Sequence, residues 1–388
     1  MIKTVAVLGR QPAISVAELE SMFGSESIES IDKNVAYLNI DAASMQINQL
    51  GGVVKLGNVI TDLSANSADE LAQGIHRYIT AAPREENKKL QLGISTYNCG
   101  SRIDGMKIAL KIKNLLRNTA ISARVVPSVN GQISTAQTIH NKLTKPGNFE
   151  MQITHQNNKF YVAQIITVQD IEAYTARDQA RPKRDARVGM LPPKLAQIII
   201  NLAQPKHAVL DPFCGTGVIL QEAALVGKQV YGTDIEPRMI DYSQTNVNQW
   251  LRMQHPEIDI NITLEVGDAT SHAWRAAPFD SIATETYLGR AYSTAPSPSE
   301  LKQNLKTVEL IHKKFLENIA KQTKTGFRLC IAVPAWFIGN RTVHLKTLDS
   351  LERIGYNRVS FVHANNDDLI YHREGQIVGR ELVTLIRK

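Results

Sequence analysis

The chain has 388 residues, of which 43% are hydrophobic and 21% are charged, and its net charge is +7. This composition is typical of a globular protein of two or three domains, and no apolar run approaches the roughly 18 residues that a membrane-spanning helix needs. Cys99, Cys214 and Cys330 are too few and too widely spaced for a disulfide framework or a zinc site, and the ten histidines form no metal-spaced cluster. The start of the chain also lacks the features of a secretion signal. We therefore expect a cytoplasmic protein with no membrane segment and no metal.

The positive charge is concentrated in one part of the chain. Residues 81–190 contain 17 lysines and arginines against eight acidic residues, a net charge of +9. Residues 1–80 sum to −4 and residues 191–388 to +2. A concentrated positive field favours a polyanion such as nucleic acid as partner. A solvated basic surface that serves solubility is the alternative, and charge alone leaves it open.

The first 170 residues alternate between short strands and helices. Strands are expected at 4–8 and 35–40, with a helix that opens at a capping box, Ser15 to Glu18, and ends near Phe23. A second capping box, Ser67 to Glu70, begins a helix that reaches about Tyr78. Further strands are expected at 90–95, 123–126 and 159–166. This alternation predicts α+β units with helices packed on a sheet.

A helix expected at 104–118 has one apolar face and one cationic face. Its apolar residues recur at helical spacing: Ile108, Ala109, Ile112, Leu115 and Leu116. Solvation alone explains each of the cations on the other face. As part of the +9 segment they become candidates for phosphate contacts, namely Lys107, Lys111, Lys113 and Arg117.

From Pro192 onward strands and helices alternate regularly. Helices are expected at 193–202, 218–226, 237–252 and from Ser297 to about Lys321, where Ser297 to Glu300 form another capping box. Strands are expected at 207–211, 229–234, 261–266, 279–284, 327–333, 358–363 and 382–385. The pattern predicts an open, mostly parallel α/β sheet. Ligands on such sheets bind beyond the carboxyl ends of the strands.

A glycine turn joins the first of these strands to the next helix. Gly215 and Gly217 let a ligand approach the backbone, the helix from Val218 offers free amides, and Asp234 at the next strand end can hold two ribose hydroxyls. A dinucleotide fingerprint would need a third glycine where Leu220 stands, and no Walker lysine follows. Asp211 repels phosphate but suits an ammonium group. The turn therefore predicts S-adenosylmethionine (SAM), with a generic βαβ turn as the alternative.

Two further strand ends complete the predicted site. Asp268, after the third strand, can accept the hydrogens of an adenine amine. Glu285 after the fourth strand stands where enzymes that methylate exocyclic amines usually present Asp/Asn-Pro-Pro-aromatic, so Glu285, Thr286 and Tyr287 are the catalytic candidates. Tyr287 is compatible with stacking on a base or with a rim position. The predicted cofactor-binding residues are Asp211, Phe213, Cys214, Gly215, Thr216, Gly217, Asp234, Ile235, Asp268 and Ala269.

Several strings along the chain resemble one family. Ser134 to Lys142, Arg177 to Asp185, Gly189 to Gln197 and Asp211 to Gly217 closely resemble the THUMP-domain tRNA guanosine methyltransferases that modify the 2-amino group at position ten. Leu8-Gly9-Arg10, Leu19-Glu20 and Val378-Gly379-Arg380-Glu381 also resemble that family. The resemblance covers nearly the whole chain. It implies a SAM-dependent, Rossmann-like methyltransferase sheet preceded by ferredoxin-like and THUMP α+β domains.

The same resemblance implies domains, partner and activity. It implies a ferredoxin-like domain at 1–64, a THUMP domain at 65–172 that grips tRNA, a linker at 173–192 and a methyltransferase domain at 193–388. Where the family has Asp-Pro-Pro-Tyr, this chain has Glu285-Thr286-Tyr287-Leu288. A catalytically weak or inactive RNA-binding protein and a DNA or RNA amino-methyltransferase with another target therefore stay open, as does a protein partner. The linker cations are compatible with RNA contact or with salt bridges between domains, and the RNA-binding candidates are Arg102, Lys107, Lys111, Arg117, Arg181 and Arg184.

Overall fold

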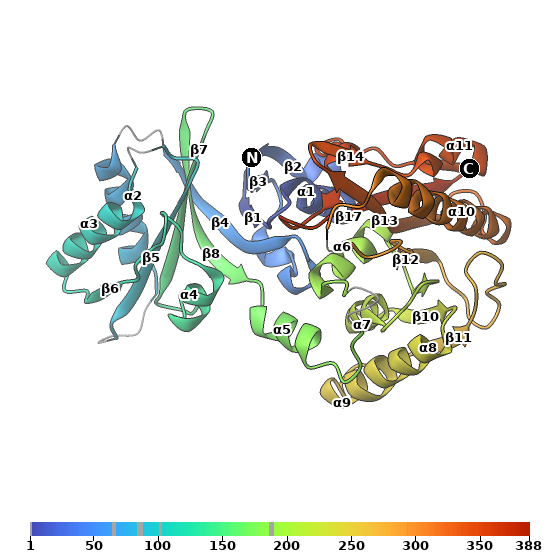
Figure 1. Cartoon of the computed structure of the whole chain (residues 1–388). Coiled ribbons are helices and arrows are strands. Elements are labelled where there is room, and N and C mark those ends of the chain that lie inside the picture. Colours follow the sequence, from blue (N-terminus) through green and yellow to red (C-terminus); the bar gives the residue numbers. More distant parts are fainter. Residues whose placement is uncertain (1, 64–66, 84–87, 101–102, 186–189, 293) are drawn as a thin grey trace. The chain divides into compact units, whose positions relative to one another are not determined.

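The computed structural model describes residues 2–63, 67–83, 88–100, 103–185, 190–292 and 294–388. The chain divides into two compact units (Figure 1). Unit 1 comprises Met1–Pro12, Glu26–Asn48 and Val53–Ile171, and unit 2 comprises Ala13–Ser25, Gln49–Gly52 and Glu172–Lys388. Within the described ranges no helix is long and apolar enough to cross a membrane, and no cluster of His, Cys, Asp or Glu could hold a metal ion.

Unit 1 is built on one sheet of eight strands, in the order β2-β3-β1-β4-β8-β7-β5-β6. The long strand β4 lies in the middle, antiparallel to β1 on one side and to β8 on the other. It therefore joins strands of the expected 1–64 and 65–172 segments in one sheet. The strands are β1 (Thr4–Leu8), β2 (Ile28–Asp32), β3 (Val35–Leu38), β4 (Val53–Leu63), β5 (Leu90–Tyr97), β6 (Ala123–Val125), β7 (Phe149–Gln156) and β8 (Lys159–Val168).

Two amphipathic helices pack on this sheet through their apolar faces. Helix α2 (Ala68–Ala81) is capped by Ser67, whose side chain accepts from the amide of Glu70, and α3 (Gly105–Asn118) is capped by Asp104. Their buried residues share one hydrophobic core with β5 and β7. A short helix, α4 (Thr135–His140), begins at a complete capping box formed by Ser134 and Gln137.

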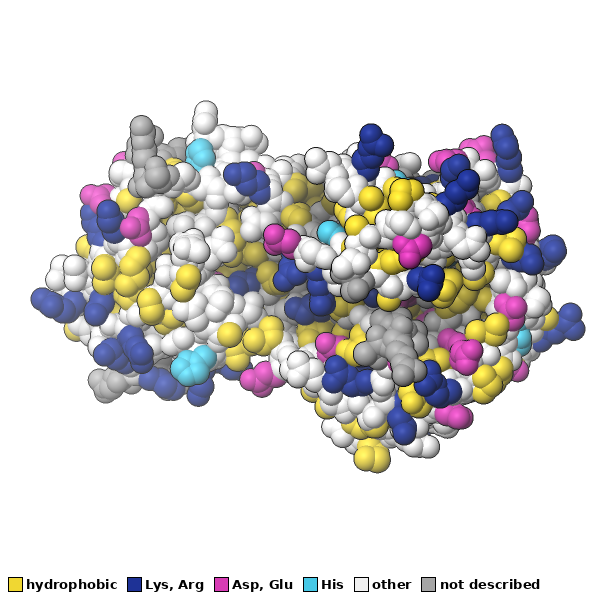
Figure 2. Space-filling model, viewed as in Figure 1, with side chains coloured by type: hydrophobic (Ala, Val, Ile, Leu, Met, Phe, Trp, Pro, Cys, Tyr) yellow, Lys and Arg dark blue, Asp and Glu magenta, His cyan; other side chains and the backbone are white. Residues whose placement is uncertain are grey.

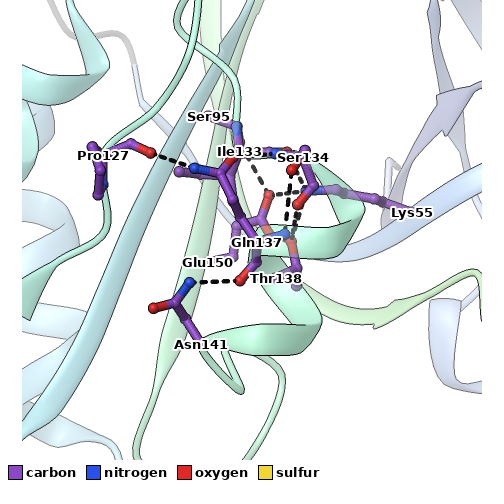
Figure 3. A network of polar contacts seen from close by, with 9 residues as sticks. All are labelled: Lys55, Ser95, Pro127, Ile133, Ser134, Gln137, Thr138, Asn141 and Glu150. Carbon is purple, nitrogen blue, oxygen red and sulfur yellow. Dashed lines mark hydrogen bonds and ion pairs between the residues drawn. The ribbon is translucent and has the colours of Figure 1, made fainter. Parts of the chain in front are cut away.

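A polar cluster lies inside unit 1 at the start of α4. The ammonium of Lys55 on β4 forms an ion pair with Glu150 on β7, and both side chains are at most 3% exposed. Figure 3 shows that the same cluster includes Ser95, Thr138 and the carbonyl of Ile133. The cluster therefore connects three strands to the start of α4.

Unit 2 contains the second sheet, whose longest path runs β11-β10-β9-β12-β13-β17-β15. The strands from β11 to β13 are parallel, and β17 is antiparallel to β13. Because the chain leaves β9 toward β10 and later returns to β12 on the other side, the strand order reverses at β9. The strands are β9 (Ala208–Asp211), β10 (Gln229–Asp234), β11 (Ile262–Val266), β12 (Ser281–Glu285), β13 (Arg328–Ile338), β14 (Arg341–Val343), β15 (Tyr356–Arg358), β16 (Ile370–Tyr371) and β17 (Val378–Arg387).

Helices cover both faces of this sheet. One core contains buried residues of α1, α6 and α7, and the other contains buried residues of α10 and α11. The helices are α1 (Pro12–Phe23), α5 (Ile171–Gln179), α6 (Pro193–Ala203), α7 (Val218–Leu225), α8 (Pro237–Ser243), a π-helix (Gln244–Leu251), α9 (Arg252–Gln254), α10 (Pro298–Gln322) and α11 (Leu351–Ile354).

Most of the predicted elements are confirmed, and three predictions are wrong. Helix α1 begins at Pro12, so Ser15 is a buried residue inside the helix and not its cap. The helix expected at 237–252 is interrupted by the π-helix. The strand expected at 358–363 ends at Arg358, after which Glu20 accepts hydrogen bonds from the amides of Val362 and His363. These side-chain contacts replace the strand pairing that the apolar pattern predicted.

Candidate cofactor and acceptor site

The carboxylates predicted at the strand ends meet around one cavity. Asp211, Asp234 and Glu285 are the last residues of β9, β10 and β12, which are neighbours in the sheet. They line a cavity of about 630 Å³, together with Gly215 of the glycine turn and Asp268, whereas Gly217 is not one of its lining residues. This volume lies in the range of about 300–1,000 Å³ that is usual for small-molecule sites. The cavity is also at the point where the strand order reverses.

Asp211 is buried at the floor of the cavity. Its Oδ1 accepts hydrogen bonds from the hydroxyl of Thr284 at 2.6 Å and from the amide of Phe213 at 3.2 Å. Burial raises the pKa of Asp211 to about 7, an effect that the two hydrogen bonds oppose and the neighbouring Asp234 and Glu285 reinforce. A cation bound beside Asp211 would favour its ionised form.

Asp234 and the glycine turn hold each other in place. The amide of Gly215 donates to Oδ2 of Asp234 and the amide of Glu236 donates to Oδ1, each at 2.9 Å. Gly217 has φ +84°, and a Cβ there would lie 2.9 Å from the hydroxyl oxygen of Ser243, so no other residue fits without a shift. Each carboxylate oxygen retains a second lone pair for a ligand hydroxyl. This arrangement suits a ribose.

The other predicted cofactor residues also line the cavity. Asp268 is exposed, and its Oδ1 is held by the amide and hydroxyl of Thr270 at 2.9 and 2.8 Å. Cys214 is buried, which raises the pKa of its thiol well above the ordinary value. A raised pKa makes a thiol a poor nucleophile, so Cys214 is not a candidate nucleophile. The remaining predicted residues on the wall are Phe213, Thr216, Ile235 and Ala269.

The three predicted catalytic residues lie along one side of the cavity. Glu285 is paired with Arg380 of β17. Thr286 is buried, with its hydroxyl 2.5 Å from Nε2 of His312, and Tyr287 is 41% exposed. Burial lowers the pKa of His312 to about 4, so its ring is neutral. Glu285 is thus the carboxylate among the three, and it lines the cavity.

Sequence reasoning missed the wall contributed by α10. Leu310, Ile311 and Lys314 line the cavity, and Leu310 is 54% exposed. The main buried face of α10 includes Val308, Phe315 and Ile319. Apolar residues beside that main face were the signal that could have identified this second surface.

The linker contacts the glycine turn through Arg181, which was predicted from sequence to bind RNA. The side chain of Arg181 is 1% exposed, and its guanidinium donates to the hydroxyl of Thr216 at 3.3 Å. Asn246 in the π-helix donates to the carbonyls of Lys183 and Thr216. Arg184, the other RNA candidate of this segment, is exposed. Burial therefore removes Arg181 from the surface that RNA could contact.

The remaining RNA candidates belong to unit 1. Lys107 and Arg117 are exposed on α3, as is Lys113. Lys111 forms an ion pair with Asp69 of α2. Arg102 lies outside the described residues.

Comparison with known protein families gives a match within unit 2. Residues 203–368 match a family model described as a methyltransferase domain. The matched stretch includes the strand-end residues Asp211, Asp234 and Glu285, which line the cavity.

Relatives with curated names extend the comparison. The chain is 26% identical over 247 residues to the tRNA (guanine(10)-N2)-dimethyltransferase of Pyrococcus abyssi, an alignment covering 63% of this chain and 66% of the relative. It is 32% identical over 131 residues to the protein of the same name from Methanocaldococcus jannaschii, covering 33% of this chain and 37% of the relative. The matched stretches thus span from about a third to two thirds of these relatives. The predicted resemblance to position-ten tRNA methyltransferases is confirmed.

A solved structure shares the fold. The crystal structure of TrmN from Thermus thermophilus aligns over 100% of both chains with a TM-score of 0.54 at 16% sequence identity. At this identity the likeness concerns the fold alone. The predicted Rossmann-like sheet is confirmed.

Proposed function

We propose that this protein is a SAM-dependent tRNA methyltransferase that acts on an exocyclic amine, the 2-amino group of guanosine at position ten. The observation that carries this proposal is the meeting of Asp211, Asp234 and Glu285 around one cavity at the edge of a methyltransferase sheet. The names of the relatives from Pyrococcus abyssi and Methanocaldococcus jannaschii support tRNA as the substrate. A tRNA substrate also supports the cytoplasm as the compartment.

The residues of the cavity fit SAM. Asp234, already fixed by two amides, would accept the ribose hydroxyls. Asp211 would face the ammonium group of the methionine part, and Asp268 would accept from the adenine amine. Gly215 leaves open space where a side chain would stand, because a Cβ there would meet only the carbonyl of Phe213 at 4.0 Å. The bound cofactor would supply a methyl group on a positively charged sulfur.

Glu285 is placed to serve the acceptor. Its carboxylate would accept a hydrogen bond from the amine, which directs the nitrogen lone pair toward the methyl group. Transfer of the methyl group from sulfur to the nitrogen would leave the electron pair of the broken C–S bond on sulfur. The nitrogen then carries a surplus proton, which Glu285 would receive and pass to water. Tyr287, exposed at the rim, would stack on the base.

Unit 1 would bind the tRNA. We propose the ferredoxin-like domain at 1–64, the THUMP domain at 65–172, the linker at 173–192 and the methyltransferase domain at 193–388 as functional divisions. Figure 2 shows dark blue lysine and arginine side chains gathered on unit 1 over α3 and α4. Exposed cations on these elements and the loops beside them support this assignment: Lys107, Lys113, Arg117, Arg124, Lys142 and Lys145.

Methyl transfer from labelled SAM to unmodified tRNA tests the proposal. Wild-type protein should label tRNA at position ten, and mapping of the modified nucleoside identifies the base and the atom. Glu285→Gln should reduce the single-turnover rate by about 10²-fold or more while SAM affinity stays within a few-fold, since one charge-stabilising group commonly contributes that much. An undiminished rate for Glu285→Gln would refute the assigned acceptor role. RNA binding without any transfer would instead identify a binding module.

A further inference from the structure

Arg380 contacts the acceptor carboxylate from an antiparallel strand of the same sheet. Strand β17 runs antiparallel to β13, so its first residues lie at the edge where the parallel strands end. In the strand register, Arg380 of β17 lies opposite Pro334 of β13. Glu285 at the end of β12 lies opposite Ala332 of β13. The topology therefore brings Nε of Arg380 into an ion pair with Oε1 of Glu285.

Both members of this pair are largely buried, but the carboxylate is not saturated. The Arg380 side chain is 9% exposed and the Glu285 side chain 14%. Within the described part of the chain, Oε1 of Glu285 has Arg380 as its hydrogen-bond partner and Oε2 has none. Because Glu285 also lines the cavity, one oxygen is anchored and the other is available to a ligand.

Other charges near Glu285 oppose its ionisation. Asp211 of β9 interacts unfavourably with it, and Asp234 of β10 adds a further negative charge to the same edge. Helix α10 contributes His312, which is neutral, and Lys314, which lines the cavity. On β13 the residue paired with Glu285 is the uncharged Ala332. Burial raises the pKa of Glu285, and Arg380 is the group that opposes this shift. The next residue of β17, Glu381, pairs with Arg358 and His344.

We propose that Arg380 is a positioning residue that keeps Glu285 ionised, with one oxygen anchored and the other presented to the acceptor amine. This inference rests on the proposed function and deepens it. Glutamate is one methylene longer than the aspartate of the resembled family, and its carboxylate has more freedom to turn. The ion pair removes that freedom. It also offsets the cost of burying a carboxylate among other acids.

The test compares Arg380→Met and Arg380→Lys with the wild type by single-turnover methyl transfer from pH 6 to 10. Without the guanidinium, nothing offsets the burial that raises the pKa of Glu285, so a larger share of Glu285 is expected to be protonated at pH 7. Arg380→Met should therefore lose about 10²-fold at pH 7 and regain up to about tenfold per pH unit as Glu285 ionises. Arg380→Lys should recover most of the rate at pH 7. SAM and tRNA dissociation constants should stay within about threefold in both variants.

Arg358→Met is the matched control, because it breaks the neighbouring pair with Glu381, which does not line the cavity. It should lower thermal stability and keep the wild-type pH profile. If Arg380→Met loses the same factor at every pH, or if Arg358→Met shifts the profile equally, Arg380 has only a structural role and the proposal is overturned. A wild-type rate in Arg380→Met would overturn it as well.

A second readout needs no methyl transfer. Infrared spectroscopy of the folded protein detects the protonated carboxyl band of Glu285, which is assigned in Arg380→Met by its loss when Glu285→Gln is added. At pH 7 the band should be absent from wild type and present in Arg380→Met. If the two proteins titrate alike, the proposal fails. If they differ as expected while wild type modifies no tRNA, Arg380 still controls Glu285 and the proposed function is the part that fails.

Discussion

Each unit contains a buried ion pair, and the two pairs differ in how fully their carboxylates are hydrogen-bonded. In unit 1, Glu150 accepts from Lys55 and Ser95 on Oε1 and from Thr138 on Oε2. In unit 2, Arg380 contacts one oxygen of Glu285, and the residue faces a cavity. A saturated carboxylate can only hold structure, whereas one with a free oxygen at a cavity can also bind a ligand. Burial and pairing alone therefore do not identify a functional acid.

The largest effect that this comparison predicts is on the stability of unit 1. Lys55→Met leaves the buried carboxylate of Glu150 without its cation, a change that commonly costs about 3–5 kcal/mol. Burial lowers the pKa of Lys55 and Glu150 opposes the shift, so the pair is mutually dependent. Hydrogen exchange of β4 and β7 should show lost protection, while SAM affinity stays unchanged.

An exposed pair on the same unit is the control for that prediction. Lys111 and Asp69 are 38% and 67% exposed, so Lys111→Met should change the free energy of unfolding by less than about 1 kcal/mol. If Lys55→Met were equally mild, the polar cluster would not hold the sheet together.

The same cluster explains which strands could not be predicted from sequence. Strand β4 carries Lys55, Gly57 and Asn58 in its first half, residue types that are depleted in strands. Only the tertiary partners of Lys55 make a buried lysine acceptable there, and those partners lie 78 to 95 positions further along the chain. Strands with uninterrupted apolar residues, such as β1 and β9, were predictable from local pattern alone.

The residues of the site also divide into those that could be predicted from sequence and those that could not. Asp211 and Asp234 follow apolar strand runs directly, so their meeting at one sheet edge could be predicted from sequence. Arg380 could not, because its contact depends on β17 running antiparallel. Asn246 could not either: its side chain binds the linker and the glycine turn, and the π-helix around it breaks the regular helical spacing on which the prediction relied.

A smaller effect is expected where the linker contacts the cofactor turn. Arg181→Met removes the hydrogen bond to Thr216, a residue of the cavity wall, and should weaken SAM binding by about tenfold, as a hydrogen bond to a charged group commonly contributes 1.5–3 kcal/mol. Isothermal titration with SAM measures the change. Arg184→Met, on the exposed side of the same segment, is the control and should leave SAM affinity unchanged. Equal losses in the two variants would show that the linker acts through general charge instead.

The smallest effect concerns the exposed cations of α3. Unlike Arg181, Lys113 is solvent-exposed, so Lys113→Ala should remove one of the proposed phosphate contacts without removing a buried side chain. The salt dependence of tRNA binding is measured as the slope of log affinity against log salt concentration. The magnitude of this slope should fall by about 1, with a few-fold loss of affinity at low salt. Lys33→Ala, an exposed lysine in the turn between β2 and β3, should leave that slope unchanged. Equal slopes for Lys113→Ala and wild type would mean that tRNA binds elsewhere on unit 1, because a released counterion must appear in the slope wherever a phosphate is contacted.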